Sequence, residues 1–124
     1  MNDLCKRLQN VSEAGVYRLN CATDDLRKNA ADCGYVMFEA NLAGAHGKGE
    51  VLAELARVIA APDWFGHNWD ALADALGDLS WKAAPGYVLV LHGEGASEEM
   101  LNDILDATVS FWKRQNKPFW VFFA

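Results

Sequence analysis

Two aspartates four residues apart, Asp70 and Asp74, are the side chains whose type and spacing best fit a chemical task. The predicted helix around them turns about 100° per residue, which places both carboxylates opposite its apolar residues, Leu72, Ala75 and Leu76. An acidic ridge of this kind is most often a solvated helix face, and Asp70 also suits the positive N-terminal end of the helix dipole. Asp74 has only Asp70 and Asp78 at four residues' distance, and like-charge pairs at this spacing cost about 0.2–0.5 kcal/mol each. The ridge is therefore a candidate for holding negative charge toward a partner.

An aromatic turn precedes this ridge, with Trp64 and Phe65 followed by Gly66, His67 and Asn68. Two adjacent residues seldom point the same way, so we expect one ring in the core and the other more exposed. Gly66 would permit a backbone conformation that a side chain resists. Exposed aromatic side chains next to acids are typical of protein–protein hot spots.

Other chemical patterns are weaker. The glycine-rich loop 44–49 lacks the phosphate-loop spacing, and Glu50 would stand where a phosphate binds. The histidines, His46, His67 and His92, lie on separate loops or element ends, so a metal site could form only if the fold brought them together. We find no nucleophile–base arrangement, and two carboxylates on an exposed helix lack the desolvation that would separate their pKa values. We therefore expect a protein that is not an enzyme and needs no cofactor.

Composition supports one folded domain. The chain has 124 residues, 52% of them hydrophobic, and a net charge of −6 from 17 acidic and 11 basic residues. Direct nucleic-acid binders normally carry a basic surface, which argues against that class. No apolar run is long enough for a signal peptide or a membrane span. The odd cysteine count and the missing Cys-x-x-Cys favour a reducing compartment, so we expect a cytoplasmic protein.

Strands and helices are expected to alternate, which predicts an α/β fold with a parallel sheet and right-handed crossovers. Expected strands are Val16–Asn20, Tyr35–Asn41, Gly86–Leu91 and Phe119–Phe123. Expected helices run from a Thr23 cap to Asp32, over Glu50–Ala60, from an Asn68 cap to Leu76, and onward from a Ser97 cap. The last three strands are apolar throughout, as in strands covered on both faces.

The segment from Ala61 to Leu76, APDWFGHNWDALADAL, closely resembles the signature of the barstar family of small bacterial ribonuclease inhibitors. The matching positions are Trp64, Phe65, Gly66, Asn68, Asp70, Ala71, Leu72 and Asp74. The resemblance covers residues 35–124, which implies a barstar-like domain preceded by an N-terminal extension over residues 1–34. It implies a three-stranded parallel sheet packed by helices, with an additional N-terminal strand and helix.

The resemblance also implies how such a protein acts. An acidic helix blocks the active site of a basic ribonuclease, with Asp74 standing in for the substrate phosphate and Asp70 supporting it. Trp64, Gly66, His67, Asn68, Trp69 and Ala73 would form the surrounding partner-binding surface. The expected partner is a basic ribonuclease or related nuclease toxin, with an immunity or antitoxin role.

This sequence departs from the family pattern at several positions. Ala73 stands where members commonly have Trp, and the region of Phe111 lacks an acid that the well-known inhibitor uses there. His67 replaces a residue that is often acidic or glycine. One alternative is therefore a barstar-like interaction module without nuclease inhibition, and another is a small hydrolase or metal-binding protein.

Overall fold

The computed structural model describes residues 7–45, 47–63 and 65–124. Within these residues, parallel strands form one four-stranded sheet in the order β1-β4-β3-β2. Its strands are β1 (Val16–Arg18), β2 (Val36–Asn41), β3 (Tyr87–His92) and β4 (Phe119–Phe123). The α-helices are α2 (Thr23–Asp32), α3 (Lys48–Val58), α4 (Trp69–Leu76) and α5 (Glu99–Arg114), and short 3₁₀ turns lie at Val11–Glu13, Ser80–Lys82 and Glu94–Ser97.

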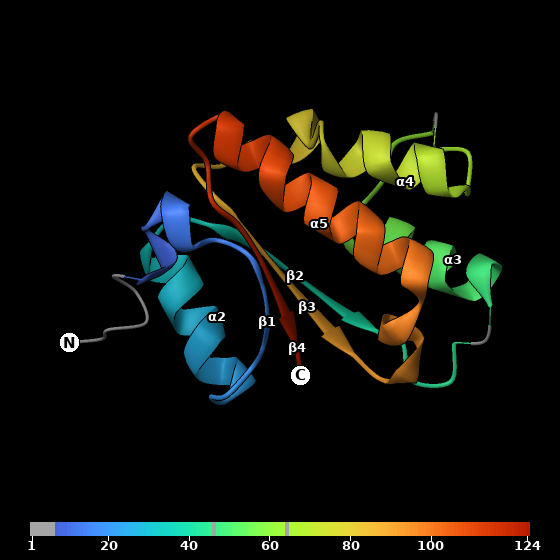
Figure 1. The fold of residues 1–124 in the computed structure, drawn as a ribbon, viewed down its shortest axis with the longest axis horizontal. Coiled ribbons are helices and arrows are strands. Elements are labelled where there is room, and N and C mark those ends of the chain that lie inside the picture. Colours follow the sequence, from blue (N-terminus) through green and yellow to red (C-terminus); the bar gives the residue numbers. More distant parts are fainter. Residues whose placement is uncertain (1–6, 46, 64) are drawn as a thin grey trace.

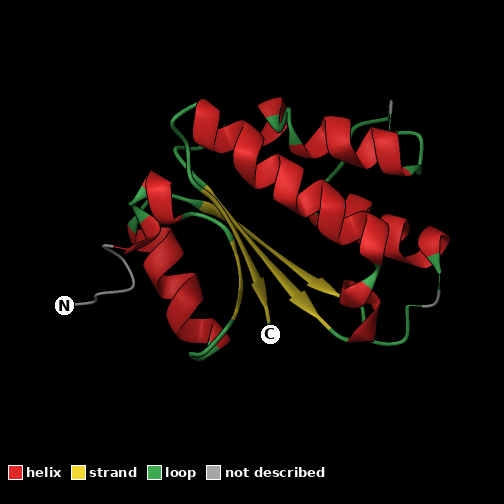
Figure 2. Ribbon diagram, viewed as in Figure 1, coloured by secondary structure: helices red, strands yellow, loops and turns green. Residues whose placement is uncertain are grey.

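The helices cover both faces of the sheet (Figures 1 and 2). Helix α2 packs on one face, and α3, α4 and α5 pack on the other. The strand order explains this division. The chain crosses the sheet in one direction from β1 to β2 and returns in the opposite direction through β3 to β4. Right-handed crossovers that run in opposite directions must place their helices on opposite faces.

The central strands, β3 and β4, are apolar because both of their faces are buried. Val88 and Val90 point toward α2, whereas Leu89 and Leu91 point toward α3, α4 and α5. The residues from Tyr87 to Leu91 are all buried, as the unbroken apolar run predicts.

The N-terminal strand joins the same sheet as the others. In β1, Val16 pairs with Val121 and Arg18 with Phe123, so β1 forms an edge beside β4. The predicted α/β fold with a parallel sheet and an additional N-terminal strand and helix is confirmed. The addition makes the sheet four-stranded, where the family resemblance alone implied three strands.

Several predicted boundaries were wrong by one or two residues. Ala22, not Thr23, is the N-cap of α2, and no side chain caps that helix. Glu98, not Ser97, occupies the N-cap of α5, because the chain first makes the 3₁₀ turn Glu94–Ser97. Helix α3 already begins at Lys48, so the predicted loop 44–49 ends at Gly47, which has the positive φ of 83°. No helix among the described residues has both the length and the apolar content needed to cross a membrane.

Candidate partner-binding site

The turn before α4 is anchored to the core by Phe65. This ring is only 8% exposed and contacts His67 edge-on, with ring centroids 5.0 Å apart. One ring of the predicted aromatic pair therefore fills the core. Trp64, the other, lies outside the described residues, so its predicted exposure stays a prediction.

The left-handed backbone conformation in this turn falls on His67, not on Gly66 as the sequence suggested. His67 has φ = 51°, whereas Gly66 is not among the positive-φ glycines. A Cβ at Gly66 would lie 3.1 Å from the Asn68 Nδ2 atom, so a side chain there would crowd the residue that caps α4. His67 is exposed, which leaves its imidazole at the surface beside the start of α4.

Asn68 caps α4 as predicted. Its Oδ1 accepts a 2.7 Å hydrogen bond from the Ala71 N–H, and its Nδ2 donates to the Gly66 carbonyl at 3.3 Å. The cap satisfies one of the N–H groups that a helix start leaves without a partner. Trp69, the first helical residue, is half-buried against the core.

The far end of α4 is fixed by a buried hydrogen bond. The Trp112 Nε1–H donates to the Leu76 carbonyl at 2.8 Å and so joins α5 to the last residue of α4. Helix α4 is therefore held at both ends, and Figure 1 shows it lying beside α5 on the outer side of the molecule.

The predicted orientation of the acidic ridge is confirmed. Leu72, Ala75 and Leu76 are buried, whereas Asp70 and Asp74 are exposed. Among the described residues, neither carboxylate forms an ion pair or a side-chain hydrogen bond. Asp63 and Asp78 are also exposed, and Asp78 accepts only a 3.3 Å hydrogen bond from the Ser80 hydroxyl. The surface of α4 thus carries concentrated negative charge that the rest of the described chain does not neutralise.

The C-terminal half of α4 also borders a groove. It has a volume of about 260 Å³ and lies between α4 and α5. Asp74 and Ala73 line it from α4, and Phe111 lines it from α5. Ala73 is exposed. Two of the positions at which the sequence departs from the family pattern, Ala73 and Phe111, therefore flank the same hollow, whereas His67 does not line it.

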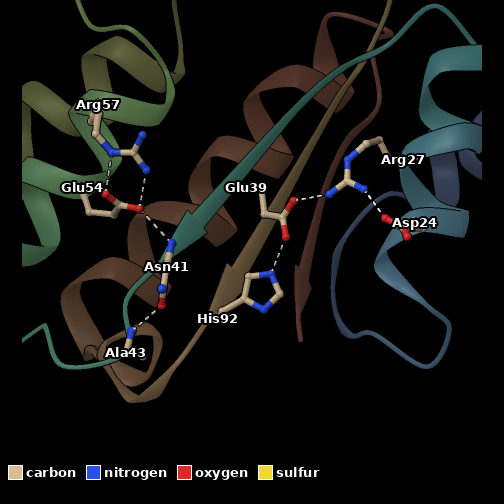
Figure 3. A network of polar contacts seen from close by, with 8 residues as sticks. All are labelled: Asp24, Arg27, Glu39, Asn41, Ala43, Glu54, Arg57 and His92. Carbon is tan, nitrogen blue, oxygen red and sulfur yellow. Dashed lines mark hydrogen bonds and ion pairs between the residues drawn. The ribbon is translucent and has the colours of Figure 1, made fainter.

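A second polar cluster, which the sequence analysis missed, lies at the carboxyl ends of β2 and β3 (Figure 3). His92 Nε2 and Glu39 Oε2 are 2.8 Å apart, and Arg27 of α2 bridges Glu39 to Asp24. Partial burial raises the pKa of Glu39, but hydrogen bonds from Arg27 and His92 outweigh it and hold the pKa below its usual value. The sequence signal that could have predicted this cluster is that Glu39 and His92 both lie near the carboxyl ends of neighbouring parallel strands.

On the other side of β2, Glu54 accepts from Arg57 and from the Asn41 backbone N–H (Figure 3). Of the predicted histidines, His67 and His92 lie apart on different elements, and His46 lies outside the described residues. No group of three or more His, Cys, Asp or Glu residues within the described part of the chain is placed to hold a metal ion. These clusters tie helices to the sheet and leave the charge on α4 untouched.

Comparison with protein families gives one result that fits this geometry. The family described as "Barstar (barnase inhibitor)" matches residues 35–124. The match begins immediately after Gly34, at the boundary that the sequence resemblance implied, and it contains α4, α5 and the groove between them. Comparison with curated proteins returned no match. Because the family match spans well over half of the sequence, the chain belongs to the barstar family, a family of inhibitors rather than of catalysts.

Proposed function

We propose that this protein inhibits a basic ribonuclease by placing α4 in the active site of that enzyme. The observation that carries the proposal is the pair of exposed, unpaired carboxylates, Asp70 and Asp74, on a helix fixed at both ends. Asp74 stands in for a substrate phosphate, and Asp70 pairs with further basic groups. Around them, the partner-binding surface consists of Trp64, Gly66, His67, Asn68, Trp69 and Ala73.

Electrostatics favours this use of α4. A carboxylate that already has an internal counter-ion must lose it before it can pair with a partner, whereas Asp74 has none among the described residues. The net charge of −6 attracts a basic enzyme at long range and raises the association rate at low salt. A helix fixed at both ends also loses little conformational entropy on binding.

The test measures inhibition of barnase, the enzyme that the family description names, and of other basic ribonucleases. Asp74→Ala should raise the inhibition constant at least 30-fold, because a hot-spot truncation costs about 2 kcal/mol or more. Asp32→Ala is the matched control, since it removes the same charge from an exposed position on α2, across the sheet. Its inhibition constant should stay within about threefold of the parent's, and inhibition by the parent should weaken as salt rises.

The proposal is wrong if the parent inhibits no basic ribonuclease, or if Asp74→Ala inhibits as well as the parent. The first result would favour the alternative, a barstar-like interaction module without nuclease inhibition. One observation favours that alternative. On α5, Phe111 lines the groove beside Asp74, in the region where the family's well-known inhibitor has an acidic residue.

We further infer that residues 1–34 are an extension, and that its described residues, 7–34, cover one face of the domain formed by residues 35–124. Leu8 and Leu26 are buried against that face, and the Trp120 Nε1–H donates to the Leu8 carbonyl at 2.9 Å. A chain that starts at Gly34 should expose Trp120 and its neighbours, and should self-associate in size-exclusion chromatography where the full chain does not. A monomeric, fully folded truncated chain would contradict this role.

We also place the protein in the cytoplasm of a bacterial cell, as an immunity or antitoxin protein. The odd number of cysteines and the missing Cys-x-x-Cys support a reducing compartment. Fractionation of producing cells, with immunodetection of the protein in the cytoplasmic fraction, tests the assignment.

A further inference from the structure

A small pocket lies where the N-terminal extension meets the sheet, on the face that α2 covers. The extension forms one side of it, and two rings of β4 form the other: Arg7, Tyr17, Arg18, Asn20, Trp120 and Phe122. Its volume is about 100 Å³. Helix α4 packs on the opposite face of the sheet, so this pocket is separate from the partner-binding surface.

The aromatic walls of the pocket are already held in position by the protein. The Tyr17 hydroxyl donates to the Glu13 carbonyl at 2.5 Å. The Trp120 Nε1–H donates to the Leu8 carbonyl at 2.9 Å. The Tyr17 ring centroid lies 5.7 Å from that of Trp120 and 6.3 Å from that of Phe122. A pocket with walls fixed in this way loses little conformational entropy when it binds a ligand.

The polar side of the pocket is positively charged. Arg18 is exposed and forms no ion pair or side-chain hydrogen bond with another described residue, so its guanidinium is available to a ligand. Arg7 pairs with Glu13, with Nε and Oε1 3.4 Å apart, in a contact between exposed side chains that water weakens. Even with Glu13 counted, the two arginines leave a net positive charge here, although the whole chain carries −6.

The free arginine also lies at the end of the sheet where α/β proteins bind ligands. Arg18 is the last residue of β1, and it lines a second, wider pocket of about 420 Å³ together with Leu91, Gly93 and Phe123. Open α/β sheets bind ligands in crevices at the carboxyl ends of their strands. A charged group held against Arg18 therefore has room outside the aromatic walls.

We propose that this pocket binds a small molecule that has one aromatic ring and one carboxylate or phosphate group. The ring lies against Tyr17, Trp120 and Phe122, and the anionic group pairs with Arg18. Enclosed cavities of about 150 Å³ hold benzene, so an open pocket of about 100 Å³ has room for one six-membered ring.

The two halves of the ligand follow from the two kinds of side chain. Aromatic walls favour a planar apolar group, because rings gain from offset or edge-on contact. A guanidinium presents a planar fork that matches a carboxylate or phosphate. Aromatic walls can also hold a cation, but the two arginines would repel one. The inference does not depend on the proposed ribonuclease inhibition, because no residue of α4 lines the pocket.

The Trp120 indole N–H gives a local readout of binding. Its resonance is followed in a nitrogen–proton correlation NMR spectrum of the isotope-labelled full chain and is assigned with Trp120→Phe. The indole N–H groups of Trp81 and Trp112 are internal controls, since they bond to carbonyls of Ile59 and Leu76 on the other side of the sheet. The probes are benzoate and phenyl phosphate, with benzyl alcohol as a neutral ring and acetate and inorganic phosphate as anions without a ring.

Benzoate, phenyl phosphate or both should shift the Trp120 resonance saturably and leave those of Trp81 and Trp112 in place. Benzyl alcohol should bind about tenfold more weakly or worse, because it lacks the charge-assisted contact. Acetate and inorganic phosphate should not shift the Trp120 resonance at concentrations at which the better aryl anion saturates. The proposal is overturned if neither aryl anion gives a saturable shift, or if benzyl alcohol binds equally well.

Variants assign the two halves of the ligand to their side chains. Arg18→Gln should weaken binding of the better aryl anion by about tenfold or more. Arg114→Gln is the matched control, since it removes an exposed guanidinium from the last turn of α5, outside the pocket, and should change the affinity by less than about twofold. Tyr17→Ala removes an exposed wall and should also weaken binding, while an unchanged Trp112 resonance shows that the variant is folded. Equal losses for Arg18→Gln and Arg114→Gln would refute the site, because net charge alone would then explain the attraction.

Discussion

Replacing Asp74 by Ala should stabilise the free protein while it weakens binding to the proposed partner. Asp74 is exposed and has no ion pair among the described residues, so its removal breaks no internal contact. It lies two residues before the last residue of α4, where the negative end of the helix dipole repels a carboxylate. Asp70 lies four residues earlier in the same helix and adds like-charge repulsion.

Three small contributions determine how much Asp74→Ala should raise the free energy of unfolding. Alanine has a better helix propensity than aspartate by about 0.5 kcal/mol. Relief of repulsion from Asp70 contributes about 0.2–0.5 kcal/mol, and relief of the unfavourable dipole contact about 0.3 kcal/mol or more at an exposed site. Together they predict a gain of about 1 kcal/mol, which corresponds to a rise in melting temperature of about 3–5 °C for a domain of this size.

Urea unfolding monitored by tryptophan fluorescence measures the gain, and Asp74→Asn separates its causes. Asn removes the charge without the propensity gain of Ala, so its smaller stabilisation should vanish in 1 M salt, where the Debye length is about 3 Å. A free energy of unfolding below that of the parent for Asp74→Ala would refute this reasoning, because it would mean that Asp74 stabilises its own fold. It would then not be a charge held for a partner.

Three further predictions concern the contacts that hold the site. Asn68→Ala should destabilise the protein by about 1 kcal/mol through loss of the bond to the Ala71 N–H, whereas Asn68→Asp, which keeps the capping oxygen, should stay within about 0.5 kcal/mol in the same urea titration. Trp112→Phe should cost about 1–3 kcal/mol, measured by thermal unfolding, because it leaves the buried Leu76 carbonyl without its donor. The hydrogen bond from the neighbouring arginine holds the pKa of Glu54 below its usual 4.5, so its stabilisation is present above about pH 4.5 and is lost as pH falls through the folded-state pKa. The stability difference between the parent and Glu54→Gln should therefore shrink between pH 5 and pH 3, and a pH-independent difference would contradict this origin.

Local signals predicted α4 well because its determinants are local. The Asn68 cap, the stop at Gly77 and the apolar spacing act within a few residues, and the structure reproduces each of them. The caps Thr23 and Ser97 were misplaced by one residue because a hydroxyl near a helix start fits several neighbouring cap positions. The positive φ at His67 could not be read from the sequence, since the neighbouring glycine was the expected site of that conformation.

Features that depend on the packing of distant segments were not predictable. The Glu39–His92 contact requires the register of β2 on β3, in which Asn41 pairs with His92 and Glu39 lies two residues earlier on the same face. The groove beside Asp74 requires the placement of α5 against α4, which the buried Trp112–Leu76 hydrogen bond sets. The sequence could predict which carboxylates point outward, but not the apolar wall that stands next to one of them.

The distribution of cations explains why α4 can keep its charge. Arg27 of α2 pairs with Glu39 of β2 and so joins that helix to the sheet. Arg57 pairs within α3 with Glu54, whose carboxylate also accepts from the Asn41 N–H of β2. The lysine and arginine in the last turn of α5, Lys113 and Arg114, complement that helix's own dipole. A fold that used one of these cationic side chains to neutralise a carboxylate of α4 would gain little stability, because exposed ion pairs contribute about 0–1 kcal/mol. It would lose a carboxylate that can pair with a partner's cation in a desolvated interface, where charge-assisted contacts are much stronger. The lack of a counter-ion for Asp74 among the described residues thus costs the fold little and leaves the carboxylate available to a partner, as the proposed inhibition requires.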